Sequence, residues 1–223
     1  MQSNTLFDTK IDEYNESNFI VHDGNRKVFD FIKTLKNDTF GVFLVLGASK
    51  SGKSYICSIW QSQTNASIID KNIFDLEYLD FVKKITEIIN QNKCFVLENI
   101  DTIMRNNENK ILYLFNLVME KKCILLLTSR ENIENFTIND LKSRFLNIPI
   151  FKLQDLDKIS KKQIILKLLT DRQMQISNDI LDFVCEKITG NYETIFNFVK
   201  NFEKMVESGD IKKVSINNIK KLI

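Results

Sequence analysis

Short apolar runs alternate with amphipathic segments over the first two thirds of the chain. Residues 43–46 form a continuous apolar run before a glycine-containing loop, as a buried parallel strand does. Further apolar runs predict strands at residues 66–69, 94–97, 123–127 and near 146–150. Helical spacing of apolar residues predicts helices at residues 26–36, 51–63, 75–89 and 110–119. This alternation predicts right-handed crossovers and a parallel sheet covered on both faces.

Beyond Phe151 the apolar spacing becomes helical only, and Ser215 opens a short last helix. The predicted fold class is therefore α/β: a three-layer parallel sheet followed by a small all-helical lid domain. We expect a flexible tail over residues 1–10, a nucleotide-binding domain over residues 11–152 and the lid over residues 153–223.

Charge and composition restrict the function classes. The 31 basic and 29 acidic residues of the 223-residue chain leave a net charge of +2. This balance argues against a protein that holds DNA by charge alone, although a local basic patch stays open. We expect no direct sequence-specific DNA binding.

The four cysteines lie far apart among apolar residues and form no CxxC pair, which predicts buried, reduced thiols. The apolar runs have the length of strands, so neither a signal peptide nor a membrane span is expected. A cytoplasmic protein without membrane partners fits best.

A phosphate-binding loop follows the first predicted strand. The residues Gly47-Ala48-Ser49-Lys50-Ser51-Gly52-Lys53-Ser54 fit the pattern GxxxxGK[ST]. Glycines let the backbone turn its N–H groups inward, Lys53 offers a charge to the β- and γ-phosphates, and Ser54 offers a hydroxyl to Mg²⁺. The flanking strand and helix supply the context that this motif requires. We therefore expect ADP or ATP with Mg²⁺.

A second element of such sites is an apolar strand that ends in an acid. Residues 94–97 followed by Glu98 meet this description, and Glu98 is predicted to hold Mg²⁺ with Ser54. Asn99 stands where hydrolysing members of the class usually place a second acid, and an amide cannot accept a proton from water. Asp101 is the nearest other carboxylate, and either a metal or water role or a capping role is open for it.

Five ordered motifs resemble the DnaA/Hda family of AAA+ ATPases, most closely its short Hda branch. The first is the entry motif at residues 18–25, and the resemblance implies adenine contacts from Phe19, Ile20 and Val21, with Tyr55 beside the phosphates. The others are the phosphate loop, the metal strand that ends in Glu98, the sensor 1 strand Leu127-Thr128-Ser129, and the segment Leu141-Lys142-Ser143-Arg144-Phe145. The resemblance makes Arg144 an arginine finger that acts in trans.

The chain departs from this family in ways that bear on hydrolysis. Arg130 stands where the initiators carry an acid after sensor 1, and Glu193 stands where they carry the sensor 2 arginine of the lid. With Asn99, these changes predict weak or absent intrinsic ATPase activity. Because Glu193 would repel a γ-phosphate, we expect a preference for ADP.

The resemblance implies a regulator rather than an initiator. The initiator's additional helix between the second and third strands and its helix-turn-helix domain are both expected to be missing. The regulator would stimulate ATP hydrolysis by the initiator DnaA through Arg144, although a surface ion pair is the alternative role for this arginine. Residues Gln2–Phe7 resemble a peptide that docks on the polymerase sliding clamp, or match it by chance.

Other functions are also considered. The alternative is an autonomous AAA+ ATPase that acts as a helicase loader or remodeller in DNA replication. A small-molecule kinase is disfavoured, because no acceptor site or mobile basic lid is evident. Whether the chain forms a homo-oligomer stays open.

Overall fold

A computed structural model describes Glu16 and residues 19–36, 39–134, 136–188, 191–208 and 215–222. The chain forms two compact units that divide after Leu153, and the short segment Ser49–Ser51 groups with the second. The N-terminal segment Gln2–Phe7, for which clamp binding is predicted, lies outside the described residues. None of the described helices is both long and apolar enough to cross a membrane.

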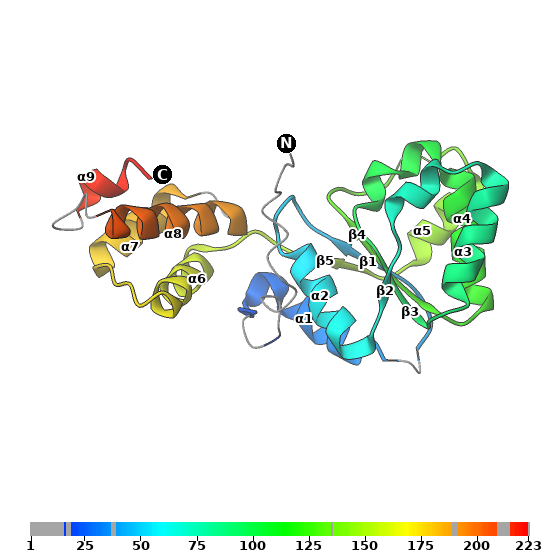
Figure 1. Cartoon of the computed structure of the whole chain (residues 1–223), viewed down its shortest axis with the longest axis horizontal. Coiled ribbons are helices and arrows are strands. Elements are labelled where there is room, and N and C mark those ends of the chain that lie inside the picture. Colours follow the sequence, from blue (N-terminus) through cyan, green and yellow to red (C-terminus); the bar gives the residue numbers. More distant parts are fainter. Residues whose placement is uncertain are drawn as a thin grey trace. The chain divides into compact units, whose positions relative to one another are not determined.

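The first unit contains a five-stranded parallel sheet with the order β2-β3-β4-β1-β5 (Figure 1). The strands are β1 (Gly41–Leu46), β2 (Ser67–Ile68), β3 (Cys94–Leu97), β4 (Ile124–Ser129) and β5 (Ile150–Lys152). Strands β1, β3 and β4 are central and almost entirely buried, which explains their continuous apolar runs.

Helices cover both faces of the sheet. They are α1 (Asp23–Thr34), α2 (Lys53–Thr64), α3 (Tyr78–Ile89), α4 (Glu108–Glu120) and α5 (Asn139–Asn147). Short 3₁₀ turns occur at η3 (Lys71–Asp75), η4 (Ile100–Thr102) and η5 (Met104–Asn106). One buried cluster joins the sheet to α1 and α2, and a second joins it to α3, α4 and α5 (Figure 1). The predicted three-layer α/β fold is confirmed.

The predicted last strand is present, but its predicted bounds, near residues 146–150, are wrong. Residues up to Asn147 belong to helix α5, and the strand begins only at Ile150. Leu141 and Phe145 are four residues apart and both buried, so they define one helical face, whereas Leu146 is 76% exposed. Pro149 then ends the helical stretch directly before β5.

The second unit consists of helices α6 (Lys158–Asp171), α7 (Asn178–Lys187), α8 (Tyr192–Glu207) and α9 (Ile216–Ile219). Its buried residues lie on facing sides of α6, α7 and α8, at the helical spacing found in the sequence. All four cysteines of the chain are free and buried, as predicted.

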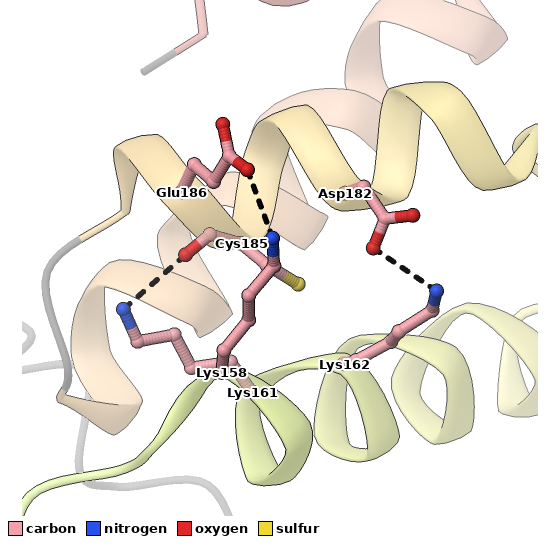
Figure 2. Close-up of polar contacts among 6 residues, drawn as sticks. All are labelled: Lys158, Lys161, Lys162, Asp182, Cys185 and Glu186. Carbon is pink, nitrogen blue, oxygen red and sulfur yellow. Dashed lines mark hydrogen bonds and ion pairs between the residues drawn. The ribbon is translucent and has the colours of Figure 1, made fainter.

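Lysines of α6 tie this helix to α7 (Figure 2). Lys161 Nζ donates to the backbone oxygens of Cys185 (3.3 Å) and Ile188 (2.8 Å) at the carboxyl end of α7. A cation is favourable there because the last carbonyls of a helix lack intrahelical partners. Two ion pairs flank this contact, Lys158–Glu186 and Lys162–Asp182. These contacts account for three of the lysines on α6 without invoking a ligand.

Candidate nucleotide-binding site

The predicted phosphate loop connects the end of β1 to the start of α2. Gly47 N donates to Ser129 O at the end of the neighbouring strand β4 (3.1 Å). Gly52 precedes the helix with φ 96°, a left-handed conformation that favours glycine. Because Gly52 has no side chain to cap α2, the first amides of the helix stay available to an anion.

Lys53 lies buried at the first turn of α2. Its Nζ donates to Gly47 O (2.6 Å) and Ala48 O (2.7 Å), so the ammonium folds back over the loop. Burial lowers the pKa of Lys53, and the charge of Arg130 lowers it further, while Asp101 and Glu98 act in the opposite direction. A phosphate in the loop would restore favourable surroundings for this ammonium.

Ser54 and Glu98 meet across the loop, as the sequence predicts for a metal pair. Ser54 Oγ donates to Glu98 Oε2 at 2.6 Å. A hydroxyl and a carboxylate are the oxygen ligands that Mg²⁺ prefers, and this ion is usually bound by few protein groups together with waters and phosphates. No cluster of three or more His, Cys, Asp or Glu side chains occurs in the described part of the chain. The pair therefore fits Mg²⁺ that arrives with a nucleotide.

The residues after Glu98 bond to the end of β4. Asn99 has a left-handed backbone, and its N–H donates to Thr128 Oγ1 (2.9 Å). Asp101 Oδ1 accepts a hydrogen bond from Arg130 N (3.2 Å). The Asp101 carboxylate thus anchors the turn after β4 and does not cap its own turn η4.

The entry segment lies beside the start of α2. Phe19 stacks on Phe29 and packs against Tyr55, with ring centroids 5.3 and 5.0 Å apart. Asn25 Nδ2 donates to Ile20 O (2.9 Å) and Asn25 Oδ1 accepts from His22 N (2.8 Å). These contacts fix the backbone on either side of Val21, which packs against the same core cluster. The residues predicted to contact adenine are thereby brought next to the phosphate loop.

Arg144 lies in the last turn of α5 and donates two hydrogen bonds to the carboxylate of Asp140. Its Nε and Nη2 donate to Asp140 Oδ1 (3.1 Å) and Oδ2 (3.3 Å). Within the described residues, neither side chain bonds to the phosphate loop or to Glu98. The predicted arginine finger is thus held by an acid of its own helix.

Glu108 holds the start of this helix, a role that the sequence analysis missed. The buried carboxylate accepts hydrogen bonds from Thr137 N (2.8 and 3.0 Å) and Ile138 N (2.7 Å). Burial alone would raise the pKa of Glu108, but these backbone bonds outweigh it and lower the pKa. Glu108 and Thr137 are 29 residues apart, and no local sequence pattern signals the contact.

The loop, the Ser54–Glu98 pair and the five-stranded parallel sheet define a P-loop protein with the fold of AAA+ ATPases. Domain III of the Thermotoga maritima replication initiation protein DnaA is similar, with a TM-score of 0.76, 17% identity and coverage of 95% of each chain. AMPPCP-bound DnaA from Aquifex aeolicus has a TM-score of 0.65 and 18% identity, over 86% of this chain and 66% of that one.

The Thermotoga maritima RuvB Holliday junction branch migration motor is also similar, with a TM-score of 0.70 and 16% identity, over 95% of this chain and 72% of that one. No protein-family model and no curated protein matches the sequence. At these identities, the likeness establishes the fold.

Proposed function

We propose that this chain is a DnaA-related regulator of chromosomal replication initiation. It binds an adenine nucleotide in its own phosphate loop and stimulates ATP hydrolysis by the initiator DnaA through Arg144. The likeness to DnaA domain III, with coverage of 95% of both chains, supports the family. The similar AMPPCP-bound DnaA supports an adenine nucleotide as the ligand.

One observation carries the proposal: the binding groups are assembled while the expected hydrolytic acid is absent. Ser54 Oγ and Glu98 Oε2 lie 2.6 Å apart, ready for a metal-bound nucleotide. Asn99 directly follows Glu98 and cannot act as a general base toward water. A chain that binds nucleotide but hydrolyses it poorly is suited to act on a partner's ATP.

Arg144 supplies the group that would act on the partner. It lies on a helix whose start is fixed by Glu108, and its guanidinium is held only by the half-exposed Asp140 among the described residues. Such a finger adds positive charge as the phosphoryl group leaves and can be worth about 10³–10⁵ in rate. Clamp docking through Gln2–Phe7 would bring the regulator to replicating DNA.

The bound nucleotide is proposed to be ADP. Glu193 lies in the first turn of α8, at the place the resemblance assigns to a phosphate-sensing arginine. Its carboxylate forms an ion pair with Lys50 of the phosphate loop, so a γ-phosphate would compete with Glu193 for this lysine, whereas ADP would do so less. Thermal unfolding with each nucleotide and Mg²⁺ tests this, and equal shifts with ADP and ATP would reject the preference.

The decisive experiment measures ATP hydrolysis by the initiator with DNA-loaded clamp. The wild-type chain should accelerate turnover, and Arg144→Ala should remove the acceleration without lowering the chain's nucleotide affinity. Arg105→Ala serves as the control, because Arg105 is an exposed arginine that lies outside the site. Full acceleration by Arg144→Ala would reject the proposal.

An autonomous ATPase, acting as a helicase loader or remodeller, is the second candidate. The intact Ser54–Glu98 pair and the likeness to the RuvB motor favour it. It predicts strong ATP turnover by this chain alone, whereas the regulator predicts acceleration only when initiator and clamp are present.

A further inference from the structure

Arg130 lies at the centre of the phosphate-binding edge of the sheet. It is the first residue after β4, and β4 is paired with β1 on one side and β3 on the other. In this register Leu46 is opposite Ser129 and Leu97 is opposite Leu127. Arg130 therefore stands between the start of the phosphate loop and the strand that ends before Glu98.

The backbone at Arg130 is fixed while its side chain is left available. Arg130 N donates to Asp101 Oδ1 (3.2 Å), and the preceding Ser129 O accepts from Gly47 N (3.1 Å). Ser129 Oγ donates to Glu131 O on the other side (2.6 Å). The guanidinium of Arg130 is exposed and has no hydrogen-bond or ion-pair partner within the described ranges. A rigid backbone thus presents a free cation at this edge.

Arg130 and Lys53 are two cations at the same edge of the sheet. Lys53 begins α2 directly after the loop, and Arg130 directly follows β4, whose last residue Ser129 accepts a hydrogen bond from Gly47 N. Two cations at the mouth of a phosphate loop repel one another. A polyphosphate anion between them would offset this repulsion. Arginine suits that ligand because its planar fork can donate two hydrogen bonds to one phosphate.

We propose that Arg130 binds the γ-phosphate of ATP in this chain's own site. The loop amides and the start of α2 would hold the inner phosphates, and Ser54 and Glu98 would hold a metal ion that offsets phosphate charge. Arg130 follows β4, which lies between the loop strand β1 and the metal strand β3, so it is placed at the edge where the outer phosphate would lie. A guanidinium stabilises the γ-phosphate but accepts no proton, so it supports binding and not hydrolysis. Its charge opposes the effect proposed for Glu193, and the two residues together set the ratio of ADP to ATP affinity.

This inference rests on the proposed nucleotide binding, and calorimetric titration of the full chain tests it. ADP and the ATP analogue AMPPCP are titrated in Mg²⁺ against wild type, Arg130→Ala, Arg130→Gln and the control Arg105→Ala. Both Arg130 variants should bind AMPPCP about tenfold more weakly and ADP less than about threefold more weakly, because a hydrogen-bonded charge is lost only with the triphosphate. Arg130→Lys should recover part of the loss.

The outcomes separate the two proposals. If the wild-type chain binds neither nucleotide, the nucleotide-binding function is rejected, and this inference is rejected with it. If it binds both but the Arg130 variants weaken ADP and AMPPCP equally, or neither, the role of Arg130 alone is overturned. Thermal unfolding without nucleotide should give the same midpoint for all variants, since the exposed Arg130 side chain has no bonding partner within the described ranges.

Discussion

The phosphate-loop edge and helix α5 hold their charged groups in different ways. At the loop, Lys53 Nζ donates to the carbonyls of Gly47 and Ala48, and Ser54 on α2 donates to Glu98, which follows β3. On α5, Arg144 pairs with Asp140 of the same helix, and a distant carboxylate holds the helix start. The comparison teaches that the first region brings together groups from different elements at the proposed nucleotide site, whereas Arg144 in the second pairs with an acid of its own helix.

The largest expected effect in this comparison is the loss of nucleotide on Lys53→Met. Binding of ADP and ATP should weaken on the order of 100-fold, because a charge-assisted contact to phosphate disappears. The unfolding free energy without nucleotide should change by less than about 1 kcal/mol, since the lost backbone bonds are offset by relief of a buried charge. Calorimetric titration and urea unfolding measure the two quantities.

Lys83→Met is the control for this variant, because Lys83 is exposed on α3 and far along the chain from the loop. It should leave both quantities unchanged. A large loss of stability in Lys53→Met with retained affinity would show that the loop lysine is structural, and the contrast between the regions would fail.

Glu108→Gln should have the reverse effect, weakening the fold and leaving ADP affinity intact. The carboxylate accepts bonds from Thr137 and Ile138, and an amide cannot replace its charge. Loss of charge-assisted bonds to a buried group should cost about 1–3 kcal/mol of unfolding free energy at pH 7. Glu120→Gln, at the exposed opposite end of α4, should cost almost nothing.

The same variant has a pH signature. The folded-state pKa of Glu108 is lowered, so its contribution is fully present above the unfolded pKa of about 4.3 and is lost as pH falls through the lower folded value. The difference in stability between wild type and Glu108→Gln should therefore stay constant from about pH 7 to pH 5 and shrink at more acidic pH. A difference that persists unchanged in acid would contradict this account.

The two regions also differ in how far the sequence predicts them. The spacing of Gly47, Gly52, Lys53 and Ser54 encodes the loop locally, and Glu98 ends a recognisable apolar strand. The contact between Glu108 and the start of α5 could not be predicted, because backbone N–H groups can donate to a carboxylate at any distance along the sequence. The spacing of four residues between Asp140 and Arg144 predicts an ion pair, but only if residues 139–147 are recognised as a helix.

The smallest expected effect comes from Asp140→Asn, which decides between two roles for Arg144. The pair is partly exposed, with side-chain exposures of 35% for Arg144 and 56% for Asp140, so its loss should cost only about 0.3–0.5 kcal/mol. If Arg144 acts on a partner's ATP, Asp140→Asn should change the rate of stimulated hydrolysis less than about threefold. Its effect on the activation free energy is limited to the small free energy of the ion pair. Arg144→Ala should abolish stimulation.

If Arg144 serves the ion pair alone, the two variants should behave alike and the double variant should match either one. Measuring stimulated turnover and unfolding of both single variants and the double variant distinguishes these cases. Equal loss of stimulation in both single variants would make Arg144 a surface contact of α5 and leave this chain without a finger.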